Sequence, residues 1–201
     1  MSRNVEIEAK ELISKENFES LYKKYAKKYT PYVQTNYLLF PFDLSMEDTR
    51  LAIRIREKNH TYEFTTKIQL SEGKLEINQV ISDREFDDFI KNNIVPKGEV
   101  YNELLDRKLC NPNNLRAFAI LKTTRIDIPY KDGLLSIDKS EYLGVTDYEI
   151  EYESTSMIKA VDTLKEFLLK EKIPFKGESK SKLKRVKERY SSSHSSPSSQ
   201  Q

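Results

Sequence analysis

The sequence is poor in the side chains on which several common chemistries depend. Of its 201 residues, one is a cysteine, Cys110, and two are histidines, His60 and His194. A single cysteine excludes an internal disulfide, and with no second Cys and no His nearby it is a poor zinc ligand. His60 falls in a polar predicted turn and His194 in a Ser-rich tail, so the sequence argues against catalysis or metal binding by histidine.

Long apolar runs and an excess of one charge are also absent. No apolar stretch approaches the roughly 20 residues that span a bilayer, and the first residues lack the apolar core of a signal peptide. We therefore expect a cytoplasmic protein that does not bind membranes. Lysine and arginine number 34 against 32 acidic residues, a formal net charge of +2, so any electrostatic function must depend on where the charges lie.

Alternation of apolar and polar residues with period two dominates the chain and predicts strands. The eight predicted strands begin at Val5, Gln34, Leu51, Tyr62, Leu75, Ala119, Leu134 and Tyr148. Short polar connections between several of them predict hairpins and antiparallel pairing. Helical spacing appears at 17–28, after a capping box at Ser82, at 99–109 and at 157–170. The predicted class is α+β, an antiparallel sheet or barrel with helices packed outside.

The charged residues of the strands fall into rows, because successive side chains of a strand point to opposite faces. The first strand, V-E-I-E-A-K at 5–10, carries two acids and a base in one row. The last strand, Y-E-I-E-Y-E at 148–153, carries acids only. Basic residues lie on the middle strands, at Arg54, Arg56, Lys67, Lys122 and Arg125. Stacked like charges are costly unless something of opposite charge binds between them.

Such rows would ordinarily be explained by one solvent-exposed face of an antiparallel sheet. Solvent-exposed faces, however, normally mix positively and negatively charged side chains. If the sheet instead closes with its charged rows inward, the acids of the first and last strands meet. Oxygen ligands without His or Cys favour Mg²⁺ or Mn²⁺. The opposite wall of Arg and Lys would suit an extended polyanion, which is the arrangement that phosphoryl transfer needs.

These motifs resemble a known family. V-E-I-E-A-K is similar to the Glu-x-Glu-x-Lys signature of the CYTH domain, also called the triphosphate tunnel metalloenzymes, and the later matches follow in the family's order. They are R-I-R at 54–56, Lys67, L-K-T-T-R at 121–125, the run from Leu134 to Glu153, and S-K-S-K-L-K-R at 179–185. The resemblance covers residues 4–186 and is greatest to the Gram-positive bacterial branch.

The resemblance implies a closed eight-stranded antiparallel β-barrel, a tunnel with helices packed outside. Residues 1–190 would form this single domain, followed by a disordered Ser-rich tail at 191–201. The lumen would hold a triphosphate and one or two divalent metal ions. The resemblance leaves open whether the protein is a monomer or a homodimer.

The family's functional residues can be carried over by position. The implied metal ligands are Glu6, Glu8, Glu149 and Glu151, of which Glu149 or Glu151 would also orient the attacking water. The implied phosphate ligands are Lys10, Arg54, Arg56, Lys67, Arg125 and Lys182. Asp138 matches an acid that could hold a basic residue or a water-bridged metal, and the role of Glu76 stays open. Lys122 would face away from Arg125 unless a bulge intervenes.

The implied reaction is hydrolysis of inorganic triphosphate to pyrophosphate and phosphate. Relatives act on thiamine triphosphate, on nucleoside or RNA triphosphates, or as adenylyl cyclases, but no motif here declares a pocket for a base or ring. A polyphosphate-binding module without turnover, and an interaction domain that docks partners through charged faces, are alternatives of other classes. Nucleic acid is a poor candidate for the main ligand, because the basic segment 180–187 has no interleaved aromatic residues.

Overall fold

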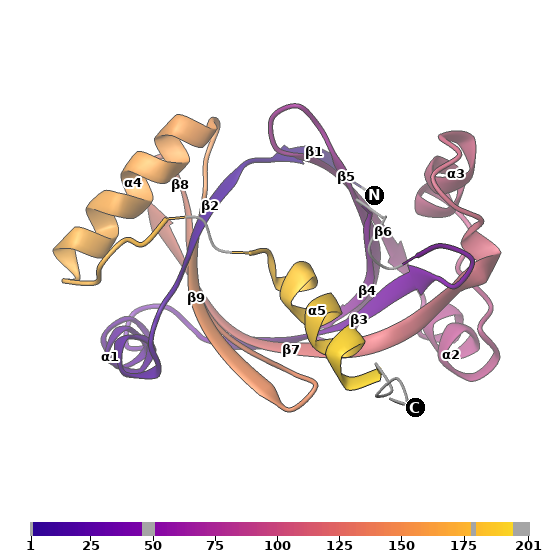
Figure 1. The fold of residues 1–201 in the computed structure, drawn as a ribbon, viewed down its shortest axis with the longest axis horizontal. Coiled ribbons are helices and arrows are strands. Elements are labelled where there is room, and N and C mark those ends of the chain that lie inside the picture. The colour runs from indigo at the N-terminus through magenta and orange to yellow at the C-terminus, as the bar shows by residue number, and fades with distance from the viewer. Residues whose placement is uncertain (1, 46–50, 178–179, 195–201) are drawn as a thin grey trace, which may run out of the picture.

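The fold centres on one antiparallel sheet that curls round into a ring (Figure 1). A computed structural model describes residues 2–45, 51–177 and 180–194. Within these residues the sheet has nine strands in the order β1-β6-β5-β4-β3-β7-β8-β9-β2. Their bounds are β1 Ser2–Glu6, β2 Glu8–Leu12, β3 Tyr32–Pro41, β4 Ala52–Lys58, β5 Thr61–Gln69, β6 Lys74–Ile81, β7 Leu115–Tyr130, β8 Gly133–Tyr142 and β9 Val145–Glu153.

The first predicted strand is in fact two strands, β1 and β2, with only Ile7 between them. β1 pairs with β6 at one end of the sheet, and β2 pairs with β9 at the other. The carbonyl of Ile7 accepts a hydrogen bond from the Ser154 N–H at 2.9 Å, so the chain changes partner at this residue. The expected eight-stranded closed barrel is therefore replaced by a curled sheet of nine strands whose two end strands are consecutive in the chain.

Four of the described helices, α1 to α4, cover the outer face of the sheet and bury the apolar rows that the sequence predicted. The described residues form five α-helices: α1 Lys15–Tyr25, α2 Asp83–Asn92, α3 Glu99–Asp106, α4 Met157–Lys170 and α5 Lys182–His194. α1 and α4 pack over β2, β8 and β9, and α2 and α3 pack over β5 and β6, each pair on its own apolar core. The capping box predicted at Ser82 and Glu85 begins α2. None of the described helices has the length and apolar character that a membrane crossing needs.

The last helix, α5, was not among the predicted helices. It buries Val186 in a small cluster with residues of β3 and β7, including Phe40 and Phe118, and in Figure 1 it lies across the ring above these strands. Residues 191–194, which the sequence assigned to the disordered tail, belong to this helix. The rest of that tail, 195–201, lies outside the described residues.

Candidate active site

The inner face of the sheet and one side of α5 enclose a cavity of about 970 Å³. Alternate residues of each strand point into it, which is why the charged rows of the sequence meet there. The predicted site residues that line the cavity are Glu6, Glu8, Lys10, Arg54, Arg56, Lys67, Glu76, Arg125, Glu151 and Lys182. Asp138 and Glu149 are fully buried and contact this lining.

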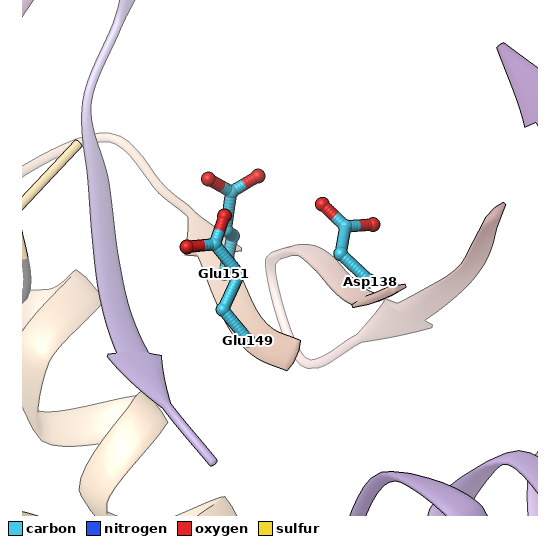
Figure 2. Close-up of side chains that lie close together, drawn as sticks. All are labelled: Asp138, Glu149 and Glu151. Carbon is cyan, nitrogen blue, oxygen red and sulfur yellow. The ribbon is translucent and has the colours of Figure 1, made fainter. Parts of the chain in front are cut away.

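Three acids form the candidate metal centre. Carboxylate oxygens of Asp138, Glu149 and Glu151 lie within 4.8 Å of one another (Figure 2). Asp138 on β8 is directly opposite Glu149 on β9, and Glu151 follows two residues later on the same face. An all-oxygen donor set fits the hard cations Mg²⁺ and Mn²⁺. Because three buried carboxylates repel one another, the cluster needs a cation.

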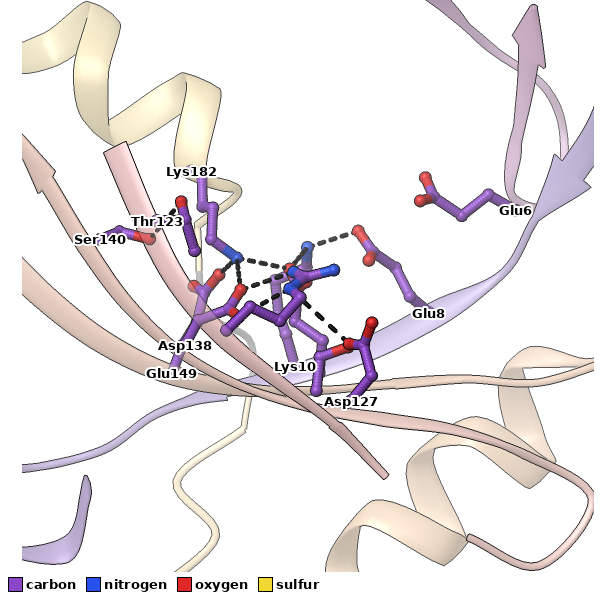
Figure 3. A network of polar contacts seen from close by, with 12 residues as sticks. Glu6, Glu8, Lys10, Thr123, Asp127, Asp138, Ser140, Glu149 and Lys182 are labelled. Atoms are coloured by element: carbon purple, nitrogen blue, oxygen red, sulfur yellow. Dashed lines mark hydrogen bonds and ion pairs between the residues drawn. The ribbon is translucent and has the colours of Figure 1, made fainter. Parts of the chain in front are cut away.

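Lys182 supplies positive charge to this cluster in the structure. Its ammonium lies 2.7 Å from Asp138 Oδ2 and 3.0 Å from Glu151 Oε1, and it also contacts Glu149 (Figure 3). Burial lowers the pKa of Lys182 to about 7. Burial alone would raise the pKa of Asp138, but Arg125 and Lys182 outweigh it and lower that pKa to about 2. Asp138 is thus held ionised by cations that come from β7 and from α5.

Two arginines complete the surroundings of the acid cluster. Arg125 donates from Nε and Nη2 to the two oxygens of Asp138, at 2.7 and 2.5 Å, and from Nη2 to Glu151 at 2.6 Å. Arg185 of α5 donates to Glu149 and to Asp147, each at 2.7 Å. Arg185 was not predicted as a site residue. Arg185 is three residues after Lys182, so the two lie on one face of a helix. If the sequence had predicted a helix there, this spacing would have indicated Arg185 as a site residue.

The other two predicted metal ligands, Glu6 and Glu8, are not part of the three-acid group. Lys67 Nζ binds both oxygens of Glu6 at 2.5 Å and also lies 2.7 Å from Glu76. Lys10 Nζ lies 2.5 Å from Glu8 and 3.2 Å from Glu151. Of the four predicted metal ligands, Glu149 and Glu151 therefore belong to the three-acid group, whereas Glu6 and Glu8 lie outside it. Lys10 contacts both Glu8 and Glu151.

Positive charge exceeds negative charge around Arg54 and Arg56 of β4. Arg56 Nε donates to the Asn36 side chain at 3.0 Å, and within the described residues no carboxylate forms an ion pair with Arg56. Burial first, and then the neighbouring cations Arg54 and Arg125, lower the pKa of Arg56 to about 9. The nearest acid to Arg54 is Glu76, at 3.6 Å. Two partly compensated guanidinium groups thus face the cavity from one strand, and planar guanidinium groups match the geometry of phosphate oxygens.

Lys122 does not belong to the site, as strict alternation along its strand predicts. It is exposed and lies on the face opposite Arg125, so it does not line the cavity. The register of β7 against β8 runs without a break from Lys122 to Arg125, and the bulge that does occur, opposite Leu38 and Leu39, comes earlier in β7. Strict alternation therefore holds at this point.

Comparison with known proteins adds to this geometry. The sequence pattern of the CYTH domain matches residues 4–186. The Bacillus subtilis protein named "Putative triphosphatase YjbK" is 30% identical over 191 residues, which are 94% of this chain and 97% of that protein. A crystal structure from Bacillus halodurans, described as a putative adenylate cyclase, is 34% identical with a TM-score of 0.82, over 92% of this chain and 98% of that one.

A plant structure shows the same fold at lower identity. It is HpAC1 from Hippeastrum, described as a putative adenylyl cyclase with a dominant triphosphatase activity. It is 22% identical with a TM-score of 0.76, over 91% of this chain and 95% of that chain. The described activity belongs to HpAC1, and the likeness to this chain is one of fold.

Proposed function

The chain belongs to the CYTH domain family, and from that premise we propose that it is a metal-dependent phosphohydrolase that cleaves inorganic triphosphate to pyrophosphate and phosphate. Its likeness over nearly its whole length to a Bacillus protein named for triphosphatase activity supports hydrolysis of a triphosphate. The inorganic substrate and the cytoplasmic location are parts of the proposal.

The observation that carries the proposal is the separation of charge inside one cavity. Three buried acids, which Lys182 neutralises in this structure, offer oxygen ligands to a metal ion, and Arg56 presents a half-buried guanidinium without an ion-pair partner among the described residues. A complex of a divalent metal ion with a polyphosphate supplies a cation for the acids and an anion for Arg56 in one ligand. A surface that docks a protein partner does not need such charges buried within a cavity.

The residues divide the work of the reaction between them. Arg54 and Arg56 would bind phosphoryl oxygens through their planar forks, and Lys10 and Lys67 would neutralise further charge. The oxygens of Asp138, Glu149 and Glu151 would hold Mg²⁺ or Mn²⁺, which when bound neutralises the phosphate charge as a Lewis acid.

In the proposed step, Glu149 or Glu151 accepts a hydrogen bond from a water molecule and holds it in line with the terminal phosphorus. The new bond forms between the water oxygen and phosphorus, and the bond from phosphorus to the bridging oxygen breaks. Pyrophosphate leaves with the bridging oxygen, and the water's proton passes to the carboxylate. Basic groups around the bridging oxygen stabilise the charge that develops on the leaving group.

The test is phosphate release from inorganic triphosphate and from ATP, with Mg²⁺ or Mn²⁺ and with EDTA. We compare the wild-type protein with Glu151→Gln, which alters the acid cluster, and with Lys122→Gln, a matched control that loses a charge on the outer face. Release should require the metal, favour inorganic triphosphate and fall on the order of 100-fold in Glu151→Gln while persisting in Lys122→Gln. Pyrophosphate release from ATP would indicate a cyclase instead. Tight triphosphate binding without turnover would indicate a binding module.

A further inference from the structure

A buried carboxylate on the outer face of β2 joins this strand to the chain that follows α4. Glu8 and Lys10 of β2 line the cavity, so alternation places Glu11 on the opposite face of the strand. Glu11 is only 1% exposed, and a carboxylate removed from water in this way needs hydrogen-bond donors. Because Glu11 faces away from the cavity, its donors must come from outside the proposed active site.

The donors are two consecutive backbone N–H groups of the segment that follows α4. Glu11 Oε2 accepts hydrogen bonds from the N–H groups of Lys176 and Gly177, each at 3.1 Å. Successive N–H groups that converge on one anion form a nest, which is a recurrent anion-binding arrangement. Ile173 of the same segment is buried in the apolar cluster beneath α4, which also covers the outer face of β2. Polar and apolar contacts therefore both fix this segment to β2.

Each side of this connection leads to a lysine at the acid cluster. Lys10 directly precedes Glu11, and Lys182 follows Gly177 by five residues. The two ammonium groups lie 3.2 and 3.0 Å from the same atom, Glu151 Oε1, and Figure 3 shows both lysines within one polar network. Five residues span at most roughly 18 Å even when fully extended, so the bond at Gly177 limits where Lys182 can lie.

Two lysines that meet at one oxygen are difficult to hold in place. Like charges repel each other more strongly within a protein than in water. Lysine side chains are also long and flexible, and confining two of them costs conformational entropy. Backbones that are already fixed relative to each other keep the two ammonium groups within reach of their common acceptor.

Resting on the proposed function, we propose that Glu11 is a positioning residue of the active site. By binding the 176–177 amides it fixes the backbones that carry Lys10 and Lys182, so that both ammonium groups stay at Glu151. Glu11 acts from the outer face of the sheet and touches neither the metal site nor the phosphate site. Without this anchor, Lys182 should leave the acid cluster more often and compete less well with a metal ion for its oxygens.

A conservative variant separates the anchor from the charge of Glu11. Both hydrogen bonds end at one oxygen, and the amide oxygen of glutamine has two lone pairs that can accept both. Glu11→Gln therefore keeps the anchor, whereas Glu11→Ala removes it. Glu11→Asp keeps the charge but shortens the side chain by one methylene group, and it replaces Glu11→Ala, with the same expectations, if that variant does not fold.

The experiment measures Mn²⁺ binding without substrate, by electron paramagnetic resonance of free Mn²⁺. It compares the wild type with the Glu11 variants, with Lys182→Gln and with the double variant Glu11→Ala, Lys182→Gln. The matched control is Gln79→Ala. Gln79 of β6 also joins two segments through two bonds to backbone groups, the Lys97 carbonyl and the Val100 N–H, but these lie beside α3.

We expect Glu11→Ala to bind Mn²⁺ about five-fold more tightly than the wild type, and Glu11→Gln to stay close to the wild type. Because Glu11 acts through Lys182, the double variant should bind Mn²⁺ as Lys182→Gln does. Hydrogen exchange of the 176–177 amides should be faster in Glu11→Ala only. Gln79→Ala should melt at a lower temperature with its Mn²⁺ affinity unchanged.

Four results would overturn the inference. An unchanged Mn²⁺ affinity in Glu11→Ala would mean that the anchor has no effect at the acid cluster. An equal rise in Gln79→Ala would reduce the effect to a general loosening of the fold. Full additivity in the double variant would show that Glu11 does not act through Lys182. A change in Glu11→Gln as large as in Glu11→Ala would assign the effect to charge.

Phosphate release from inorganic triphosphate is measured on the same proteins and tests the proposed function separately. If triphosphate is hydrolysed, kcat should fall about ten-fold in Glu11→Ala and be restored in Glu11→Gln. The expected pattern of Mn²⁺ affinities without hydrolysis by the wild type would support the role of Glu11 and refute the proposed function. Hydrolysis without that pattern would do the reverse.

Discussion

A half-buried cation without an ion-pair partner costs free energy, and within the described part of the chain Arg56 is such a residue, although Glu63 lies opposite it on β5. Removing an unpaired charge from water costs several kcal/mol even after the protein relaxes. The Asn36 side chain accepts one hydrogen bond from Arg56, but it is neutral and cannot balance the charge. We therefore interpret Arg56 as a residue whose ion-pair partner is an anionic ligand.

We predict that Arg56→Gln makes the ligand-free protein more stable, because the variant no longer buries the charge. Its melting temperature should rise by about 2–4 °C, and the stabilisation that triphosphate gives the wild type should largely disappear. Differential scanning fluorimetry with and without triphosphate measures both effects, with Lys122→Gln as the control on the outer face. A ligand-free variant that melts below the wild type would show that Arg56 has a structural partner instead.

Lys182 occupies the place that a metal ion would need. Its ammonium contacts Asp138, Glu149 and Glu151, so it competes with a divalent cation for the same oxygens. We predict that Lys182→Gln binds Mn²⁺ about ten-fold more tightly in the absence of substrate, although its turnover falls. Electron paramagnetic resonance of free Mn²⁺ gives the affinity. Lys180→Gln, which removes an exposed lysine near the start of α5, is the control, and unchanged affinity in Lys182→Gln would rule out competition.

At the scale of the elements, the sequence predicts most strands because alternation is a local property. It could not predict the break at Ile7, because alternation continues through residues 5–10, past the residue at which the pairing partner changes from β6 to β9. The sequence did not predict α5, because a segment rich in Lys and Ser has few apolar residues that could pack against the sheet. Only the folded chain shows that Val186 is fully buried in an apolar cluster with residues of β3 and β7.

The same distinction between local pattern and tertiary packing explains which features of the candidate site the sequence could predict. Rows of charge showed which side chains face the cavity, since this depends on alternation alone. Distances between residues of different strands depend on register, which the rows do not fix. In the structure Glu8 lies opposite Glu153, and Lys10 lies opposite Glu151. This register separates Glu8 from the three-acid cluster by a lysine, which the sequence alone could not show.

The turn at Gly73 packs against Ile7, where the chain changes strand partner, so a substitution at Gly73 tests the importance of this packing. Gly73 has a φ of 74°, and a Cβ there would lie 2.5 Å from the Glu6 carbonyl oxygen and 2.8 Å from Ile7 Cγ1. Gly144 has nearly the same φ, 75°, with nothing within 4 Å of its Cβ position. We predict that Gly144→Ala costs about 1 kcal/mol for its backbone conformation. Gly73→Ala should cost about 2 kcal/mol more, because the clash adds overpacking.

Urea denaturation of the two alanine variants compares these costs directly. Since the two φ angles match, the difference between the two costs reports the contact with Glu6 and Ile7. Equal destabilisation would mean that the turn moves away freely, and that close packing against Ile7 is unimportant for the change of strand partner.

For the whole molecule, the cavity is a network of acids and bases that pair with one another. Burial alone would raise the pKa of Glu76, but Lys67 and Arg54 outweigh it and lower that pKa from 4.5 to about 2. A carboxylate with a lowered pKa contributes stability above its unfolded-state pKa and loses it as the pH falls through the folded-state value. Asp138 behaves in the same way.

We therefore predict that the free energy of unfolding falls as the pH decreases from about 4.5 towards about 2, as these carboxylates take up protons. In Glu76→Gln this fall should be smaller by a few kcal/mol, because one of the contributing groups no longer titrates. Denaturation curves at several pH values measure it, with the surface variant Glu19→Gln as the control. An unchanged pH dependence in Glu76→Gln would contradict the assignment of stabilisation to this pair.

The pairing of charges also governs how the protein responds to its ligands. A metal ion alone must displace Lys182 from the acid cluster, and a triphosphate alone must compete with Glu6 and Glu76 for Lys67. Each ligand alone therefore breaks pairs and leaves charges of one sign unbalanced. A metal ion and triphosphate together provide charges of both signs, so the two should bind cooperatively.

We predict that Mg²⁺ with triphosphate raises the melting temperature by more than the sum of the shifts that each produces alone. At about 100 times the dissociation constant, binding contributes about 2.7 kcal/mol, which is roughly 5–10 °C for a chain of this size. Thermal melts with each ligand, with both, and with EDTA measure the difference, and Glu149→Gln should lose the excess. Strictly additive shifts would mean that the acid cluster and the basic wall bind their ligands independently, in which case the internal pairs do not couple metal binding to substrate binding.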